Sequence, residues 1–199
     1  MKTADVIIVG SGASGLFNAL FLPQDYKVIV ITKKEVEESD SFLAQGGISA
    51  LKNPEDYDSY FEDTMKAGHY ENDKGAVEKM IKESPQIIQD LKDFGVRFDL
   101  KDGEIEFTRE GGHSTFRILH HEDLTGKEIT SHLYEEAKKR DNITIMENCT
   151  MIDIIEKDGE CKGIVYKDAD GNLDTIEAPD TVLATGGPGG LFTHSTNFR

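Results

Sequence analysis

The sequence has little cysteine and no long apolar run. Cys149 and Cys161 are its two cysteines, and their spacing does not resemble a set of metal ligands. We expect two buried thiols rather than a disulfide. No apolar stretch approaches the roughly 20 residues of a transmembrane helix, and Lys2 leads directly into a strand pattern rather than a signal peptide. These absences predict a soluble, cytoplasmic protein without a metal site.

Positive charge is also scarce. Acidic residues outnumber Lys and Arg by 38 to 22, which gives a formal net charge of −16. This excess argues against a broad nucleic-acid or anionic-membrane surface, although it leaves room for a local anion pocket. The chain contains no repeat, low-complexity tract or Pro/Gly-rich linker. We therefore assign residues 1–199 to one domain, with or without an appendage.

The most informative stretch is residues 5–15, which read DVIIVGSGASG. The β-branched run Val6–Val9 predicts a short strand that is buried on both faces. The glycines that follow have the spacing G-x-G-x-x-G, and residues 13–22 predict the next helix. A strand, this glycine pattern and a helix together predict a dinucleotide-binding turn, with a plain strand–helix turn as the alternative.

Each glycine of this motif has its own mechanical task. We expect Gly10 to make the tight turn, Gly12 to admit a pyrophosphate close to the backbone, and Gly15 to let the helix pack on the strand. The helix N-terminus offers free N–H groups and a partial positive charge to phosphates.

The end of the second predicted strand, Lys27–Thr32, argues against an ordinary NAD site. Such a site carries an Asp or Glu here to hold a ribose hydroxyl, but this chain has Thr32 followed by Lys33. Thr32 can still bond a ribose, and Lys33 can reach a phosphate or a sugar. We interpret the next carboxylates, Glu35 and Glu37, as part of a solvated acidic loop.

Two further loops are candidates for ligand contact. Residues 39–48 (SDSFLAQGGI) suit a backbone that lies against a flat ligand, or a simple turn before a helix. Residues 107–114 (FTREGGHS) combine two glycines with ionisable side chains. Glu110 could meet a cationic group there and His113 a carboxylate; the alternative is an exposed hairpin with an Arg109–Glu110 charge pair.

Residues 55–93 are predicted to be helical and to serve mainly the core. The pattern predicts a first helix that stops at Gly68 and a short second helix around residues 77–81. A third helix is predicted to begin with Ser84 as N-cap and Pro85 at its first position, and to end at Gly95. The Met and Tyr residues in this region are expected in the core. A further helix is predicted over Lys127–Lys139.

The rest of the chain is rich in strand patterns. Residues 143–148 predict a strand, and residues 151–178 predict a small antiparallel meander with a D-G turn at 158–159. Thr181–Ala184 predicts a last buried strand, closed by a second glycine turn at residues 185–190. Both glycine turns are expected at the same sheet edge, where ligands bind in open α/β sheets. The adjacent His120 and His121 are interpreted as loop or core histidines rather than a metal pair.

Taken together, these motifs resemble the succinate dehydrogenase/fumarate reductase flavoprotein family. The strings VIIVGSGASGL, SFLAQGGISA, TREGGHS and VLATGG, with D-x-T-G at residues 123–126, extend the resemblance over the whole chain. A-Q-G-G-I is specific to the family, and R-E-G-G-H-S favours its branch that oxidises L-aspartate. The resemblance implies an α/β fold: a Rossmann-like FAD-binding domain with a parallel sheet, a helical insertion and a small antiparallel β-meander.

The resemblance also implies FAD as cofactor, and a role for each motif. The first glycine turn, with Ser11–Ser14 at the pyrophosphate, is implied to contribute Gly10, Ser11, Gly12, Ala13, Ser14 and Gly15. Thr32 and Lys33 are implied near the adenosine side, and the backbone of Thr150 and Met151 at the adenine. The segment along the ribityl chain and flavin ring is Asp40, Ser41, Phe42, Leu43, Ala44, Gln45, Gly46 and Gly47, and the second glycine turn contributes Thr185 and Gly186. Glu110 matches the position that orients the ammonium group of the substrate. The implied reaction oxidises L-aspartate to iminoaspartate, with dioxygen or fumarate as acceptor, and supplies quinolinate synthase in NAD biosynthesis.

Two departures from the family modify these expectations. Membrane-bound members have a histidine that bonds covalently to FAD five residues before Gln45, whereas this chain has Asp40, so we expect dissociable FAD. The family continues well past residue 199, through a capping domain. The chain is therefore expected to be an inactive amino-terminal fragment that stops at Ser195–Arg199, just before an acidic segment that contacts FAD. A soluble fumarate reductase and a non-catalytic FAD- or NAD-binding module remain the alternatives.

Overall fold

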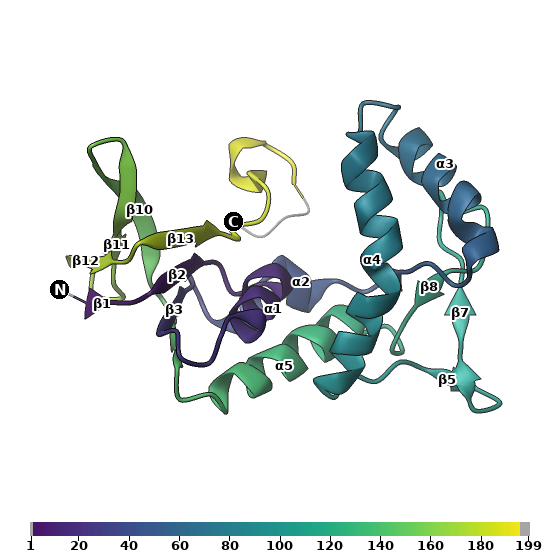
Figure 1. Cartoon of the computed structure of the whole chain (residues 1–199), viewed down its shortest axis with the longest axis horizontal. Coiled ribbons are helices and arrows are strands. Elements are labelled where there is room, and N and C mark those ends of the chain that lie inside the picture. The colour runs from purple at the N-terminus through teal and green to yellow at the C-terminus, as the bar shows by residue number, and fades with distance from the viewer. Residues whose placement is uncertain (1, 196–199) are drawn as a thin grey trace. The chain divides into compact units, whose positions relative to one another are not determined.

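The computed structural model describes residues 2–195, so most of the terminal segment Ser195–Arg199 lies outside the described residues. The chain divides into two compact units, one formed by Met1–Leu43 with Ile129–Arg199 and one by Ala44–Glu128. Figure 1 labels those of their helices and strands for which there is room. No helix among the described residues is long and apolar enough to span a membrane.

A four-stranded parallel sheet forms the centre of the first unit. Its order is β13 (Asp180–Leu183), β2 (Val6–Val9), β3 (Val28–Ile31) and β9 (Ile143–Met146), and every neighbouring pair is parallel. All residues of β2 and β3 are buried, as continuous β-branched runs predict. The predicted parallel α/β fold is confirmed.

The strand predicted near residues 181–184 forms as β13, but the expectation that it is buried is wrong. β13 is an edge strand of this sheet, and Leu183 is 56% exposed. An edge strand has a partner on one side only, so an apolar run there does not require burial on both faces.

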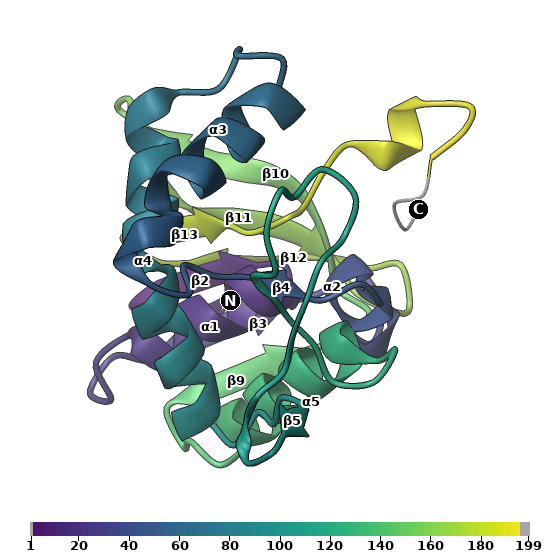
Figure 2. The same ribbon diagram turned by 90° about the vertical axis from the view of Figure 1, so that its right-hand side faces the viewer.

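A second, mostly antiparallel sheet covers one face of the parallel sheet. Its order is β1 (Lys2–Thr3), β12 (Leu173–Glu177), β11 (Glu160–Lys167) and β10 (Thr150–Lys157). Figure 2 labels β10, β11 and β12 of this sheet. Asp158 and Gly159 both have positive φ, at 56° and 81°, as a type I′ hairpin turn requires. The predicted meander is confirmed.

The core of the first unit lies between the two sheets and under α1. Alternate residues of β2 and β3 pack against Ile164, Tyr166 and Ile176 of the meander. The remaining residues of these strands point to the opposite face. Helix α1 (Ala13–Phe21) packs on β2 and β3 and buries Gly15, Leu16, Ala19 and Leu20. The sequence therefore builds a three-layer unit from strands buried on both faces.

Helix α5 (Thr125–Lys138) begins in the second unit and continues into the first. Its buried Leu133 and Ala137 lie on the part that belongs to the first unit. Tyr134 donates a hydrogen bond to Glu147, just after β9, with an O···O distance of 3.4 Å. The predicted helix over residues 127–139 is confirmed.

Two helices dominate the second unit. α3 (Tyr57–Ala67) follows the short 3₁₀ turn η2 (Pro54–Asp56) and ends at Gly68 as predicted, and α4 spans Lys74–Asp93. The helices share a core of Tyr60, Met65, Val77 and Ile81. Met80 and Tyr70 are 46% and 59% exposed, so the core position expected for both residues is wrong.

Residues 74–93 form one helix, not the two that were predicted, because a serine compensates for the internal proline. Pro85 has no N–H to donate to the carbonyl of Ile81, four residues earlier. The Ser84 hydroxyl donates to that same carbonyl instead, at 2.7 Å. Ser84 is buried inside α4 and is not an N-cap. The predicted end is close to the observed one, since Gly95 has φ +89° just after the helix.

Short strands complete the second unit. β4 (Ile48–Ser49), β8 (Ile118–Leu119) and β7 (Phe107–Thr108) form one sheet with antiparallel neighbours. β5 (Leu100–Lys101) pairs with β6 (Glu104–Ile105). The candidate loop around Glu110 therefore connects β7 to β8.

We predict that Ser84→Ala destabilises the protein. Besides donating to Ile81, the Ser84 hydroxyl accepts a hydrogen bond from the backbone N–H of Leu51 at 2.8 Å. The alanine leaves both backbone groups without this partner, which costs about 1–3 kcal/mol of unfolding free energy. Urea unfolding measures the change. The exposed neighbour variant Glu83→Ala is the control, with an expected change below about 0.5 kcal/mol; equal effects of the two variants would contradict the prediction.

Candidate functional site

A cavity of about 580 Å³ opens at the carboxyl ends of the parallel strands. Its lining comes from the turns after β2, β3 and β13 and from residues 149–151, all in the first unit. The volume is in the range of small-molecule sites, and this edge is where open α/β sheets bind ligands. The prediction that both glycine turns lie at one sheet edge is confirmed.

Gly10 and Gly15 allow three backbone segments to meet at this edge. Gly10 has φ +113°, and a Cβ built on it would lie 2.2 Å from the carbonyl oxygen of Ala184. A Cβ on Gly15 would lie 1.9 Å from the carbonyl oxygen of Gly10. No side chain fits at either position, so the tight turn expected at Gly10 and the close packing expected at Gly15 are present.

The N-terminus of α1 and Ser11 provide hydrogen-bonding groups at the cavity wall. The Ala13 N–H donates to the Ser41 hydroxyl at 3.0 Å, and a Cβ on Gly12 would also lie 3.0 Å from that oxygen. Ser11 is 2% exposed, lines the cavity, and its hydroxyl has no hydrogen-bond partner among the described residues. A buried hydroxyl without a partner is costly, so this oxygen is suited to a bound ligand.

The outer wall of the cavity continues from β3 into an acidic turn. Thr32, Lys33 and Glu35 line it, so the loop interpreted as only solvated also borders the cavity. The backbone N–H of Val36 donates to Glu147 at 3.0 Å, which ties this wall to the segment after β9. The wall contains the short elements η1 (Val36–Glu38) and α2 (Asp40–Leu43).

Most of the nominated cofactor residues in the first unit line this one cavity. Those that do are Gly10, Ser11, Gly12, Ser14, Thr32, Lys33, Asp40, Ser41, Thr150, Met151, Thr185 and Gly186. The cavity is also lined by residues that were not predicted to contact the cofactor, among them Lys34, Glu38 and Cys149. Ser39 and Gly187 line it too, within the two loops that were expected at a ligand. Adjacency could have identified Lys34 and Cys149, since each lies next to a predicted cofactor residue, whereas Glu38 lies at the end of η1 and has no such signal.

The remaining nominated cofactor residues lie elsewhere. Ala13 and Gly15 sit in α1 beside the lining residues, and Phe42 and Leu43 lie in α2. Residues 44–47 belong to the second unit, where they lead into β4. Gly47 has φ +132°, and a Cβ there would lie 2.6 Å from both the Ile118 side chain and the Leu119 carbonyl oxygen. The pairing of β4 with β8 therefore requires glycine at this position.

The loop that carries Glu110 is exposed over its first part. Glu110, Gly111 and Gly112 are exposed, whereas His113 is half-buried. Within the described chain no ion pair joins Arg109 to Glu110; the Arg109 guanidinium lies 5.6 Å from the centre of the Phe116 ring. The alternative prediction for this loop is an exposed hairpin with an Arg109–Glu110 charge pair. The exposed hairpin is present, but the charge pair is not found among the described residues.

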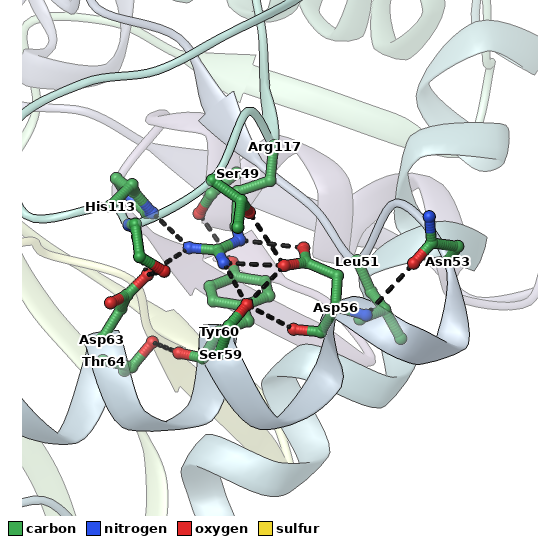
Figure 3. Close-up of polar contacts among 12 residues, drawn as sticks. Ser49, Leu51, Asn53, Asp56, Ser59, Tyr60, Asp63, Thr64, His113 and Arg117 are labelled. Atoms are coloured by element: carbon green, nitrogen blue, oxygen red, sulfur yellow. Dashed lines mark hydrogen bonds and ion pairs between the residues drawn. The ribbon is translucent and has the colours of Figure 1, made fainter.

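A fully buried arginine lies at the end of this loop, and sequence reasoning missed its role. Arg117 is 0% exposed and makes a forked ion pair with Asp56, with N···O distances of 2.7 and 2.9 Å (Figure 3). It also bonds Asp63 at 2.6 Å and His113 Nδ1 at 3.1 Å. No short-range signal in the sequence identifies these partners, because Asp56 and Asp63 come from η2 and α3, far earlier in the chain.

The network shifts the ionisation of its members. Hydrogen bonds from Arg117, Ser59 and Thr115 lower the pKa of Asp56 to about 2, in spite of its burial. Burial raises the pKa of Asp63, but bonds from Ser114 and Arg117 outweigh it, so the net shift is downward. Both carboxylates are therefore charged at neutral pH and compensate the buried guanidinium.

The paired histidines lie beside acidic side chains. His120 and His121 approach Asp99 at 3.2 and 3.3 Å, and His121 lies 3.8 Å from Glu128. The described residues contain no cluster of three or more side chains suited to a metal. Both cysteines are free thiols.

Comparison with known proteins identifies the class of this chain. A model of the FAD binding domain family matches residues 5–198. The chain therefore belongs to this family, and its cofactor is FAD.

The particular proteins that it resembles include L-aspartate oxidases. It is 44% identical to that of Clostridium perfringens over 198 residues, which cover 100% of this chain and 45% of the relative. The L-aspartate oxidase of Clostridium acetobutylicum is also 44% identical, over 98% of this chain and 45% of the relative. The chain thus spans less than half the length of these relatives.

A solved quinol fumarate reductase from E. coli has the same fold over 99% of this chain and 35% of its own, with a TM-score of 0.91 and 28% identity. The residues around the cavity also fit FAD chemically. The N-terminus of α1 suits a pyrophosphate, and the Ser11 hydroxyl, which has no hydrogen-bond partner among residues 2–195, can bond one of its oxygens.

We predict that Gly15→Ala destabilises the protein although Gly15 lies in a helix. In an unconstrained helix the change would stabilise by up to about 1 kcal/mol. Here the new methyl group collides with the Gly10 carbonyl, and we expect a net loss of about 1–3 kcal/mol, as for other overpacked sites. Gly190→Ala, with no atom within 4 Å of its added Cβ, is the control. Unchanged or raised urea stability in Gly15→Ala would contradict the close approach.

We also predict that the stabilisation due to Asp56 depends on pH. The pKa of Asp56 is about 2 in the folded protein and 3.8 without its partners, so this stabilisation is full above pH 5 and is lost as the pH falls toward 2. At pH 6, Asp56→Asn should lower the unfolding free energy by about 2 kcal/mol. The difference in unfolding free energy between this variant and the unsubstituted protein should become smaller as the pH falls from 5 to 3.

Urea unfolding across that pH range measures this difference. Asp58→Asn, at an exposed aspartate two residues later in α3, is the control and should show a small, constant difference. A difference for Asp56→Asn that stays constant with pH would contradict the assignment.

Proposed function

We propose that residues 1–199 are the FAD-binding part of an L-aspartate oxidase of the cytoplasm. The observation that carries the choice of substrate is the 44% identity to L-aspartate oxidases over essentially the whole chain. The observation that supports the cofactor site is the cavity between the two glycine turns. The proposed reaction oxidises L-aspartate to iminoaspartate and passes two electrons to dioxygen or fumarate.

The proposed binding roles follow from the chemistry of the cavity wall. Ser11–Ser14 and the N-terminus of α1 hold the pyrophosphate, since backbone N–H groups and the helix dipole favour anions. Thr32 and Lys33 bind the adenosine side, and the backbone of Thr150 and Met151 meets the adenine. Thr185 and Gly186 close the site from the end of β13.

Residues 40–47 are proposed to follow the ribityl chain and the flavin ring. Asp40 stands where covalent members of the family carry histidine, and a carboxylate is not expected to form that bond. We therefore propose that FAD is held non-covalently.

In the proposed reaction, FAD held in the cavity would supply the acceptor for the hydride equivalent removed from Cα of L-aspartate. Glu110 is the residue of this chain proposed to act on the substrate, because a carboxylate can bind and orient its ammonium group. The iminoaspartate product would serve quinolinate synthase in NAD biosynthesis. The acidic surface of the chain supports a protein that binds neither nucleic acid nor anionic membranes.

A fumarate reductase is the second candidate. The likeness to the E. coli quinol fumarate reductase favours it, with a TM-score of 0.91, but the identity is only 28%, against 44% for the L-aspartate oxidases. The substrate of the full-length protein separates the two.

The first test is FAD retention by the chain itself. We expect a chain that has been mixed with FAD and desalted to keep the yellow flavin spectrum, and acid precipitation to release the colour into the supernatant. Colour in the acid pellet would contradict the non-covalent site. A folded chain, judged by circular dichroism, that retains no colour would contradict an FAD site formed by residues 1–199.

The second test addresses the substrate. L-aspartate added without oxygen to the FAD-loaded full-length protein should bleach the flavin absorbance, and fumarate should restore it. D-aspartate is the control for stereospecific reaction at Cα. Flavin that stays oxidised with L-aspartate would overturn the oxidase assignment, and bleaching by succinate alone would favour the fumarate reductase alternative.

A further inference from the structure

The loop around Glu110 has little packing of its own. Glu110, Gly111 and Gly112 are exposed, and a Cβ added to either glycine would meet no atom within 4 Å. Two adjacent glycines leave a backbone free to sample many conformations. A carboxylate on such a loop can select a substrate only if the loop is anchored from outside.

The anchor is the network around Arg117. The guanidinium bonds His113 Nδ1 at 3.1 Å, and the backbone N–H of His113 closes a turn onto the Glu110 carbonyl at 3.2 Å. Because arginine can only donate, His113 Nδ1 must accept and the ring proton is on Nε2. The next residue, Ser114, donates from its backbone and its hydroxyl to Asp63, at 2.7 and 2.8 Å.

The same arginine also contacts the segment that follows residues 44–47. The Arg117 carbonyl accepts a hydrogen bond from the Ala50 N–H at 3.1 Å, and its guanidinium lies 4.8 Å from the centre of the Tyr60 ring. The Tyr60 hydroxyl donates to the Ser49 hydroxyl at 2.6 Å. Figure 3 shows Ser49, Tyr60 and His113 gathered around Arg117.

Stability alone does not account for this network. A buried ion pair often adds little to stability, and well-packed apolar residues of similar volume often replace it without loss. The N–H donors of the guanidinium lie in one rigid plane, so the groups that accept their hydrogen bonds are held in a fixed geometry. In this chain those partners belong to η2, α3 and the Glu110 loop.

We propose that Arg117 is a positioning residue that holds the Glu110 loop in a fixed register with the segment of residues 44–49, and so selects an ammonium-bearing dicarboxylate. The inference rests on the proposed function, in which Glu110 binds the substrate ammonium and residues 44–47 meet the flavin. Arg117 acts through Asp63, His113 and Ser114 and touches neither ligand.

Hydrogen exchange of the chain without FAD tests the anchor itself. Asp63→Asn keeps the Arg117–Asp56 fork but removes the charge that holds Ser114, so it is the variant least expected to unfold. The amides of His113 and Ser114 should exchange about ten-fold faster, as the loss of one charge-assisted hydrogen bond implies. Amides of β2 and β3 should be unchanged. The proposal would be overturned if exchange became equally faster at all amides, or if the exchange of His113 and Ser114 did not change.

Ligand binding to the FAD-loaded full-length protein tests the selectivity. Flavin difference spectra measure the affinity for each ligand. Arg117→Lys should weaken the binding of L-aspartate about ten-fold, but the binding of succinate, which has no ammonium group, by less than about two-fold. The exposed Arg97→Lys is the matched control and should change neither. Asp63→Asn serves in the same assay if Arg117→Lys does not fold.

A double-substitution cycle separates this inference from the proposed function. Glu110→Gln should weaken the binding of L-aspartate but not that of succinate. Adding Arg117→Lys to this variant should weaken L-aspartate binding little further, because both substitutions act through the same contact. Additive losses, or equal losses for both ligands, would overturn the positioning role alone. A Glu110→Gln variant that binds L-aspartate normally would instead overturn the proposed role of Glu110.

Discussion

The close approach of β2, α1 and β13 is the constraint on which the rest of the first unit depends. The Gly10 turn passes directly over the Ala184 carbonyl, and Gly15 presses against the Gly10 carbonyl. These contacts leave no room for a Cβ, so they set how closely helix and strands meet. With that spacing, the N-terminus of α1 and the Ser11 hydroxyl face one cavity, and the turn after β13 closes it.

The second unit depends on a different interaction, a buried charge. Arg117 is enclosed by Asp56, Asp63, Ser59 and the Tyr60 ring, and it connects the β7–β8 loop to α3. Taking a guanidinium out of water is costly, so the two carboxylates must stay charged, and the lowered pKa of Asp56 reflects this requirement. Steric constraint organises the cofactor cavity, whereas electrostatic constraint organises the candidate substrate loop.

Sequence patterns predicted the elements well where the local and the tertiary demands agree. The strands β2 and β3, the meander turn at Asp158 and the helix stop at Gly68 all follow from short-range preferences. The prediction failed at Ser84, where a hydroxyl replaces the hydrogen bond that Pro85 cannot make. The prediction of burial also failed at β13, because the residues of a strand do not show whether it lies in the middle or at the edge of its sheet.

For the candidate site, the family resemblance supplied many of the residues that line the cavity, while the sequence by itself determined the glycine turn and the parallel α/β class. These are local properties, since backbone sterics and strand burial act within a few residues. Only the tertiary structure decided that Asp56 and Asp63 enclose Arg117, that Ser41 meets the N-terminus of α1, and that the loop after Glu110 is anchored at His113 and Ser114. Such contacts join residues far apart in the chain, and they exist only once the intervening segments have folded.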